Sequence, residues 1–397
     1  MSQINVRNLS NENEDGAPDI VGVSTFSATS YFVPPVGTTA QRPENPQGGD
    51  LRFNTDTASL EYFRGDTINW TQIEMTSPEL GGGTGSNTGT GARGLYGGGQ
   101  VSPSTGSYTD DIDYLTISTL GNAVNFGNLS DGSRSGRGVL SSRTRAVFGS
   151  GYGPADDMHY VTIASTGDST AFGLELANGS SRGGLSNGTR GCFAGRLEGS
   201  PSYGNVNVIS YITIASLGNA KDFGDLSVDG RGSPGAAASS TRGIWAGGGS
   251  SYVEYVTIDY VTISTTGDAI DFGDLTGYGG KTNATAGGSN STRAIWWGGT
   301  DTPGYSNTNN ITYNTIASKG DSVEFGDTSV TTHAGGAMPD ATRLVMKLGV
   351  KNNGSTATNL IEYVQIATLG DSVDFGDSVN ETYSVSLGSC SSAHGGL

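Results

Sequence analysis

The stretch Ser291-Thr-Arg-Ala-Ile-Trp-Trp-Gly-Gly299, followed by Gly320-Asp-Ser-Val-Glu-Phe-Gly-Asp327, decides the fold because it recurs along the chain. Six copies of this unit, each about fifty residues long, follow one another from Ala92 onward. An arginine opens each copy and a Phe-Gly pair closes it, and both markers keep one period while the loop between them varies. We number the repeats 1 to 6 by their arginines, which are Arg93, Arg145, Arg190, Arg242, Arg293 and Arg343.

Each repeat predicts four short β-strands. In repeat 4 these are a run of small residues (Ala236-Ala-Ala-Ser-Ser240), the arginine strand (Arg242-Gly-Ile-Trp-Ala-Gly-Gly248), a Tyr-Val-Thr-Ile strand and the run Ala269-Ile-Asp-Phe-Gly273. Alternation of Val, Ile, Thr and Tyr, broken by Gly, Asn and Asp, is the signal of half-buried strands. Four strands in each of six repeats predict an all-β chain and a six-bladed β-propeller, in which four-stranded sheets surround a channel.

The two ends of the repeat region predict ring closure. Residues 383–393 form one more small-residue strand after repeat 6, whereas repeat 1 lacks such a strand before Arg93. We therefore expect the C-terminal strand to enter the first blade as its innermost strand, which removes two unpaired sheet edges.

Repeat 4 contains a duplication. Tyr255-Val-Thr-Ile-Asp is followed at once by Tyr260-Val-Thr-Ile-Ser, and only one copy can occupy the third strand in register. The sequence leaves open whether the other copy extends the strand or bulges into the loop.

The repeats resemble kelch repeats. The similarity lies in the Gly-Gly that ends the second strand, the Tyr-Val-Thr-Ile third strand, the aromatic residue of the fourth strand and the Arg/Ser/Gly run that leads into the next repeat. Phe stands in the fourth strand where kelch repeats usually have Trp, and the local motif is Phe-Gly-Asp. The resemblance covers about three quarters of the chain and implies a kelch-like propeller.

Residues 1–80 differ in composition from the repeats, with fewer glycines and more charged residues and prolines. A small meander is readable in Leu51-Arg-Phe-Asn54, Leu60-Glu-Tyr-Phe63 and Asn69-Trp-Thr-Gln-Ile73, with Phe53, Tyr62 and Trp70 expected on one face. Residues 81–91 read as a flexible Gly/Ser/Thr linker. We therefore expect three parts, which are a β-rich module (1–80), a linker (81–91) and the propeller (92–397).

The module resembles a segment of virion structural proteins from tailed phages, especially marine phages of cyanobacteria. The shared pattern is Gly37-Thr-Thr-Ala-Gln-Arg-Pro43, Gly49-Asp-Leu-Arg-Phe-Asn-Thr-Asp-Thr57, Leu60-Glu-Tyr62 and Trp70. The resemblance implies a virion component, at the surface of tail or capsid, whose residues 1–80 attach to other virion proteins. Because fibres are often trimeric, it also implies a homo-oligomer such as a trimer, although no coiled-coil pattern accompanies it.

Composition limits the partners. The net charge of −17, from 21 basic and 38 acidic residues, disfavours a nucleic-acid partner, since that binding rests on basic side chains. No apolar run approaches membrane-spanning length and the first residues contain no apolar signal core, so we expect synthesis in a host cytoplasm and no membrane insertion. Cys192 and Cys390 belong to no metal or redox pattern, and we expect buried free thiols.

The loops between the second and third strands are the candidate binding site. Corresponding loops of a propeller gather on one face, and tyrosines with nearby Asn, Ser and Asp suit recognition of sugars or surface antigens. The alternative is that these tyrosines pack locally. Five of the six loops carry one, at Tyr108, Tyr152, Tyr203, Tyr252 and Tyr305, and the sixth has Lys351.

Other chemistry is poorly supported. The repeated aspartates, such as Asp371, Asp374 and Asp377, could suggest calcium, but repeat 1 replaces them with Asn122, Asn125 and Asn128, so we expect no metal site and no cofactor. The six opening arginines are expected to bridge neighbouring sheets through backbone carbonyls or aspartates. The three histidines (His159, His333 and His394) are scattered and form no catalytic set.

The sequence thus predicts a non-enzymatic phage virion protein of fibre or adhesin type, whose propeller binds a host-surface glycan or outer-membrane component. One alternative is a purely structural protein that decorates capsid or tail. A weaker alternative is a propeller enzyme that acts on host polysaccharide. A solvent-facing aromatic cluster on the loop face favours the adhesin over the decoration.

Overall fold

The computed structural model describes residues 34–57, 59–65, 69–72, 92–102, 107–130, 132, 136–152, 156–180, 182–198, 204–249, 254–277, 286–301, 306–351, 356–382 and 388–393. The chain divides into two compact units, Met1–Ser77 and Pro78–Leu397. Both are built from strands, and the one helical element of the described residues is a short 3-10 turn, η1 (Thr39–Gln41). The all-β character expected from the alternating sequence is therefore confirmed.

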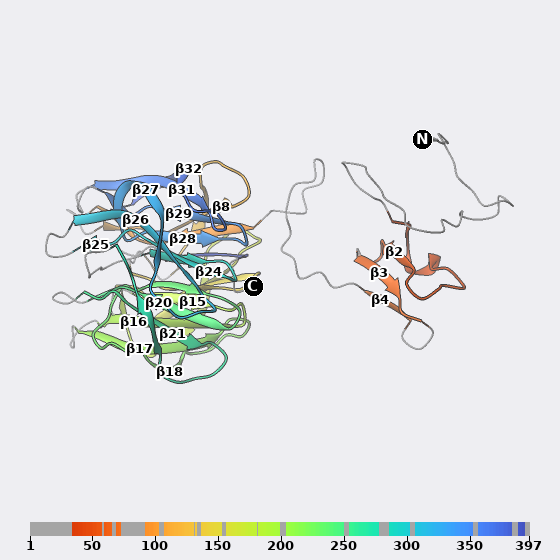
Figure 1. Ribbon diagram of the computed structural model, residues 1–397, viewed down its shortest axis with the longest axis horizontal. Coiled ribbons are helices and arrows are strands. Elements are labelled where there is room, and N and C mark those ends of the chain that lie inside the picture. Colours follow the sequence, from red (N-terminus) through yellow and green to blue (C-terminus); the bar gives the residue numbers. More distant parts are fainter. Residues whose placement is uncertain are drawn as a thin grey trace. The chain divides into compact units, whose positions relative to one another are not determined.

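The N-terminal unit contains one four-stranded sheet (Figure 1). Its order is β1 (Val36–Gly37), β2 (Leu51–Asn54), β3 (Ser59–Phe63) and β4 (Trp70–Gln72), with β1 parallel to β2 and the other pairs antiparallel. Trp70 pairs with Phe63, and their ring centroids are 5.5 Å apart. Phe53 pairs with Leu60, which lies three residues before Phe63 on β3 and therefore on the opposite face of the sheet. The expectation that Phe53, Tyr62 and Trp70 share a face is therefore wrong for Trp70.

Repeats 1 to 3 each form a sheet with the strand order that the sequence predicts. Repeat 1 pairs β33 (Gly388–Ser391), β5 (Arg93–Gly97), β8 (Asp111–Thr116) and β9 (Val124–Asn128). Repeat 2 pairs β10 (Val139–Ser141), β11 (Arg145–Phe148), β12 (Asp157–Thr162) and β13 (Thr170–Leu174). Repeat 3 pairs β15 (Gly183–Ser186), β16 (Arg190–Glu198), β17 (Asn205–Thr213) and β18 (Lys221–Asp225), with β14 (Gly179–Ser180) also on β16.

Repeats 4 to 6 continue the pattern. Repeat 4 pairs β19 (Gly235–Ala238), β20 (Arg242–Ala246), β21 (Thr257–Thr262) and β22 (Ile270–Asp274). Repeat 5 pairs β23 (Ala286–Ser289), β24 (Arg293–Trp297), β26 (Ser306–Thr315) and β27 (Val323–His333). Repeat 6 pairs β28 (Gly336–Pro339), β29 (Arg343–Lys347), β31 (Thr356–Gln365) and β32 (Val373–Thr382).

Three short additions lie in the loops between second and third strands. Strand β6 (Gln100–Ser102) pairs with β7 (Ser107–Tyr108) in repeat 1, and β25 (Thr300–Asp301) pairs with β26 in repeat 5. Strand β30 (Val350–Lys351) pairs with both β27 and β31, and thereby joins the sheets of repeats 5 and 6. The repeat pattern does not predict this junction, because it depends on the extension of β27 to His333 and on the added strand β30.

The C-terminal strand closes the first sheet. Strand β33 pairs antiparallel with β5, and Cys390 lies opposite Leu95, which confirms the predicted placement of this strand. The innermost strands also contact one another in a complete cycle, in the order β33, β10, β15, β19, β23, β28 and back to β33. Their hydroxyl side chains link neighbours: Ser186 donates to the carbonyl of Ser141, Ser141 to that of Ser391, and Ser289 to that of Ala238.

The duplicated segment of repeat 4 is resolved in favour of its second copy. Tyr260 lies in β21 opposite Ile244, at the register position of the other third-strand tyrosines. Tyr255 lies before the strand, and its hydroxyl donates to the carbonyl of Asp229 at 3.1 Å. The first copy therefore extends into the loop.

The core is divided among six clusters, and each cluster combines side chains of two consecutive repeats. One joins Leu185 and Cys192 of repeat 3 to Trp245 of repeat 4, and another joins Tyr96 of repeat 1 to Met338 of repeat 6. Such a core is distributed between the sheets. Both cysteines are buried and free, and burial raises the pKa of each thiol to about 12, so they are unreactive.

The opening arginines join each repeat to the next one. Each guanidinium stacks on the third-strand tyrosine of its own repeat, 4.4 to 4.7 Å from the ring centroid. Each Nη1 also donates to an isoleucine carbonyl of the following repeat at 2.7 to 3.0 Å. The predicted bridging through backbone carbonyls is confirmed, with Ile163, Ile214, Ile263, Ile316, Ile366 and Ile117 as acceptors in repeat order.

The repeated aspartates have a matching role. Asp268 Oδ1 accepts a hydrogen bond from the backbone N–H of Asp225 in the preceding repeat, at 3.1 Å. Asn122 Oδ1 accepts the equivalent bond from Asp377, at 3.0 Å. The position needs one oxygen acceptor and no charge, which explains why asparagine replaces aspartate there.

Candidate functional site

Two of the five candidate tyrosines lie together on the loop face. Tyr108 ends β7 of repeat 1 and Tyr152 follows β11 of repeat 2, and their ring centroids are 6.2 Å apart at an interplanar angle of 32°. Tyr152 is 60% exposed, and Tyr108 is half-buried. The loops of two neighbouring repeats thus present a pair of phenol rings to solvent. Tyr203, Tyr252 and Tyr305 lie outside the described residues.

The loop under Tyr108 is anchored by polar contacts. Thr109 donates from its hydroxyl to Asp111 at 2.6 Å, and its backbone N–H donates to the carbonyl of Gly99 at 2.9 Å. Asn380 of repeat 6 donates to the same carboxylate at 3.0 Å. Gly99 has φ of 110°, a conformation that favours glycine, so the hairpin can turn tightly here.

The loop under Tyr152 is held by a buried acid. Glu175 accepts a hydrogen bond from the backbone N–H of Ser150 at 2.6 Å and forms an ion pair with Arg182, whose side chain is also buried. Ser150 in turn donates from its hydroxyl to the carbonyl of Gly179 at 3.3 Å. Because the described residues beside both tyrosines are held by these contacts, the tyrosine pair loses little conformational entropy when a ligand covers it.

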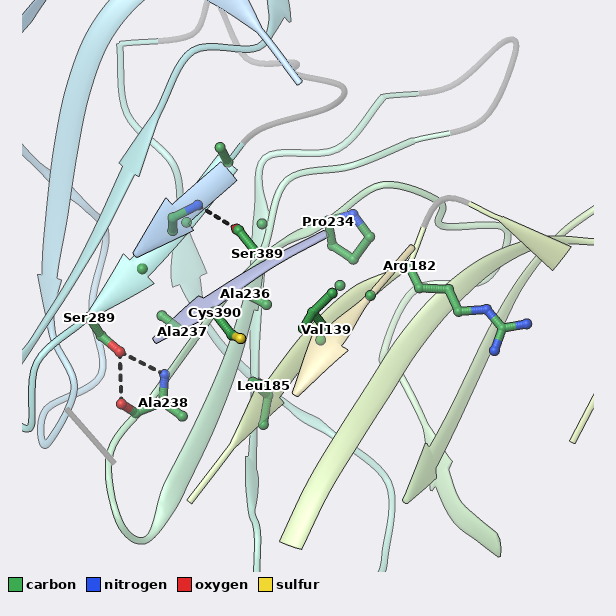
Figure 2. Close-up of a pocket in the computed structure, with 18 of the residues that line it drawn as sticks. Val139, Arg182, Leu185, Pro234, Ala236, Ala237, Ala238, Ser289, Ser389 and Cys390 are labelled. Atoms are coloured by element: carbon green, nitrogen blue, oxygen red, sulfur yellow. Dashed lines mark hydrogen bonds between the residues drawn. The ribbon is translucent and has the colours of Figure 1, made fainter. Parts of the chain in front are cut away.

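The central cavity is a poor ligand site. It has a volume of about 110 Å³ and is lined by the innermost strands, with Val139, Ala236 and Ser389 among the lining residues (Figure 2). Pockets for drug-sized ligands occupy roughly 300–1,000 Å³. A larger residue does not fit at Gly184 in the cavity wall, since its Cβ would lie 2.7 Å from the backbone of Val139. The volume is below that range and is large enough for water molecules.

Buried cations near the start of the inner strands were not anticipated from the sequence. Arg231 is fully buried, pairs with Asp259 at 2.6 Å, and donates to the carbonyls of Trp245 at 3.1 Å and Thr257 at 2.6 Å. Arg137 and Arg182 precede their inner strands in the same way. The available signal was the Arg-Gly pair before the inner strand in these three repeats. Their carbonyl contacts indicate a structural role.

A second set of polar residues precedes the third-strand tyrosines. His159 Nδ1 lies 2.8 Å from the Ser130 hydroxyl, Asp259 accepts from Ser227 at 2.5 Å, and Glu362 accepts from the Ser329 hydroxyl. Each contact joins one repeat to the next inside the molecule. These groups lie away from the cavity lining and do not form a catalytic pair.

A carboxyl and an imidazole inside the repeats have shifted pKa values. Burial raises the pKa of Asp113 to about 6 and lowers the pKa of His333 to about 4. His333 Nδ1 lies 2.9 Å from the side-chain oxygen of Asn307. Asp113 belongs to β8 and His333 to β27, in repeats 1 and 5, so the two groups do not act on one site.

In the N-terminal module, residues of the pattern from Gly37 to Trp70 contact one another and stabilise the sheet. Arg42 binds Glu61 with two hydrogen bonds, at 3.1 and 2.6 Å, and Asn54 donates to the same carboxylate at 3.1 Å. The guanidinium groups of Arg42 and Arg52 each lie 5.9 Å from the ring centroid of Trp70. The hydrogen bonds from Arg42 hold the pKa of Glu61 below its usual range. The pattern residues therefore form one internal cluster.

Within the described ranges, no group of three or more His, Cys, Asp or Glu side chains is arranged to hold a metal ion. A helix of the length and apolarity needed to cross a membrane is also missing from the described part of the chain. No protein-family model matches the sequence, and no curated protein is similar to it.

Proposed function

We propose that the unit Pro78–Leu397 is a six-bladed, kelch-like β-propeller. The support is the strand order of the six repeats, the cycle of contacts among the innermost strands, and the arginine bridges that run from each repeat to the next. In this reading each repeat is one blade, and β33 completes the first. The junction of β27 with β30 is then an added link between two blades.

The proposed function is host-surface recognition by a phage virion protein of fibre or adhesin type. The observation that carries it is the pair of Tyr108 and Tyr152, which two neighbouring repeats present on the loop face. Phenol rings offer a flat apolar surface to the face of a sugar ring and a hydroxyl to its polar edge. Asp110 and Asp111 follow Tyr108 and supply hydrogen-bond acceptors for sugar hydroxyls. The binding class is therefore a glycan or a glycan-bearing outer-membrane component.

In this proposal residues 1–80 attach the protein to other virion proteins. The support is the resemblance of the pattern from Gly37 to Trp70 to phage virion modules, together with the internal cluster that makes this module a stable unit. The partners are then virion proteins on one side and a host glycan on the other. Homo-oligomerisation, as in trimeric fibres, belongs to the same proposal, as does a location on the virion surface.

A purely structural role is the second candidate. Two observations favour it: every repeat makes contacts with its neighbours, and the central cavity has a volume of only about 110 Å³. A rigid ring without a ligand suits a protein that decorates a capsid or tail. The two candidates differ in whether the tyrosine pair is needed for adsorption.

The test is competition with adsorption of the phage that carries this protein. The purified full chain should block adsorption, Tyr108→Ala and Tyr152→Ala should each lose most of the block, and Tyr152→Phe should keep it because the ring remains. A glycan array probed with the same proteins identifies the sugar. If the folded wild-type chain does not block, the structural role is favoured. If all variants block equally, the chain recognises the host through another surface and the tyrosine pair is not the recognition site.

A further inference from the structure

An apolar band lies at the start of the fourth strands of repeats 5, 6 and 1 and in the turns that precede these strands in repeats 6 and 1. It consists of five large aliphatic side chains, each 53 to 59% exposed. Single exposed aliphatic residues are normal on protein surfaces, but a contiguous group marks an interaction site. We call this group the apolar band, and its members are Val323, Leu369, Val373, Leu120 and Val124.

Hydrogen bonds between repeats bring these residues next to each other. The backbone N–H of Gly121, next to Leu120, donates to the carbonyl of Phe375 at 2.9 Å, which places that turn against the strand of Val373. The N–H of Gly370, next to Leu369, donates to the carbonyl of Phe325 at 2.9 Å and places its turn against the strand of Val323. Each leucine of the band thus lies in a turn next to the strand that carries a valine of the preceding repeat.

The residue directly before the glycine of each turn, such as Leu120 before Gly121, places its side chain against the preceding repeat. In repeat 5 the position is Lys319, whose Nζ lies 5.5 Å from the ring centroid of Tyr260 in repeat 4. Tyr260 is the cross-strand partner of Ile270, as Tyr363 is of Val373 and Tyr313 is of Val323. The leucines therefore stand in the position that covers a tyrosine and its paired valine.

The band does not continue around the ring. The equivalent positions of repeats 2, 3 and 4 contain mainly polar residues, which interrupt any apolar contact. Leu217 and Ile270 are as exposed as the band residues, but Leu217 adjoins the strand of Thr170 and Ile270 adjoins Lys319. The polar members of these positions are Thr166, Thr170, Lys221 and Thr266.

The surroundings of the band are acidic. Asp321, Glu324, Asp371 and Asp374 are exposed on the same turns and strands. The basic residues of the repeats offer little compensation, because the six opening arginines are stacked on tyrosines and bridged to carbonyls. Of the other cations described in the repeats, five are buried, namely Arg137, Arg182, Arg196, Arg231 and Lys347. Arg143, Lys221 and Lys319 are exposed and Lys351 is half-buried. Among these, Lys319 lies at one end of the band, in the turn before Val323, where it faces the ring of Tyr260. If a second copy of this chain docked on the band through the same surface, the carboxylates of the two copies would face and repel one another.

We propose that the apolar band is a docking surface for a basic, apolar segment of another protein. Aliphatic side chains of that segment would cover Leu120, Leu369 and the adjoining valines, and its lysines or arginines would face the surrounding carboxylates. Burial of the band supplies the affinity, and charge complementarity supplies the selection against acidic partners. This surface lies on the outer strands, whereas the tyrosine pair lies in the loops, so the proposal is independent of glycan recognition.

The experiment uses the full chain and a labelled synthetic peptide of alternating leucine and lysine, with a leucine and glutamate peptide of equal length as the acidic counterpart. Binding is followed by fluorescence anisotropy at low and high salt. We expect the basic peptide to bind, with affinity that falls as salt rises, and the double variant Leu120→Ser/Leu369→Ser to weaken binding at least about tenfold. The acidic peptide should not bind.

Leu217→Ser is the matched control, because Leu217 has the same turn position and the same exposure outside the band. It should leave peptide binding unchanged. Equal weakening by Leu217→Ser, no effect of the double variant, or equal binding of the acidic peptide would each overturn the proposal. Sedimentation completes the test: wild-type dimerisation that the double variant abolishes would identify a second copy as the occupant, and would also overturn it.

Discussion

The guanidinium of Arg343 in the last repeat donates a hydrogen bond of 2.8 Å to the carbonyl oxygen of Ile117 in the first. The same bond joins each of the other repeats to its successor, so Arg343 joins the last repeat to the first in the same way. Gly121 adds a second closing contact through its N–H to the carbonyl of Phe375 at 2.9 Å. The boundary between repeats 6 and 1 thus has the same bonds as the five remaining boundaries between repeats.

Replacement of Arg343 tests this closure. Arg343→Ala removes a charged hydrogen bond and a cation–π contact, and we expect it to lower the free energy of unfolding by about 2–4 kcal/mol. Arg190→Ala at an internal boundary is the matched variant and should have an equal effect, measured by urea unfolding. A neutral Arg343→Ala beside a destabilising Arg190→Ala would show that repeats 6 and 1 are not joined in solution.

The Phe-Gly pair requires glycine for a second reason besides its backbone angle. Gly224 has φ of 143°, and a Cβ there would lie 2.6 Å from the backbone of Gly267 in the next repeat. Gly267 has φ of 149° but open space around its Cβ position. We expect Gly224→Ala to lower the melting temperature more than Gly267→Ala, by an amount that corresponds to about 1–3 kcal/mol of overpacking. Equal shifts would mean that the backbone angle alone requires glycine.

The buried pair of Arg231 and Asp259 should be sensitive to loss of one partner. Asp259→Asn leaves a fully buried guanidinium without its counter-charge, and we expect a loss of about 3–5 kcal/mol of stability. Arg231→Met/Asp259→Leu removes both charges and should restore much of that loss, because the desolvation penalty disappears as well. Urea unfolding of the three proteins measures this. A double variant less stable than Asp259→Asn would contradict the interpretation.

Asp113 should make stability depend on pH. Burial raises its pKa to about 6, so the folded protein binds a proton more readily than the unfolded chain between about pH 4 and pH 6. This carboxyl therefore lowers stability progressively as the pH rises through that window. Asp113→Asn should unfold like the wild type near pH 4 and be more stable by about 1–2 kcal/mol at pH 7.5. Asp271→Asn, which removes an exposed carboxyl, is the control for the change in net charge. A difference between Asp113→Asn and the wild type that is the same at pH 4 and pH 7.5 would contradict this role of Asp113.

The interpretations that rest on the repeat agree with the structure for a physical reason. Arg242 occupies the same local pattern as five other arginines, and the same pattern folds into the same stack on tyrosine and the same bridge to a carbonyl. The missing first strand of repeat 1 likewise predicts the pairing of Cys390 with Leu95. Outside the repeats no second copy of the pattern indicates the register, and Trp70 lies opposite Phe63 and off the expected face.

The sequence by itself thus determined the six repeats, their four strands, the inter-repeat arginines and the C-terminal strand of the first sheet, because alternation and period are local properties that every copy repeats. Only the tertiary structure decided that Tyr108 and Tyr152 form a pair, that Arg231 is buried against Asp259, and that Leu120 lies beside the strand of Val373. These relationships join residues of different strands or repeats at positions that vary from copy to copy. Their distances depend on how the sheets pack and where the loops run, which no periodic pattern encodes.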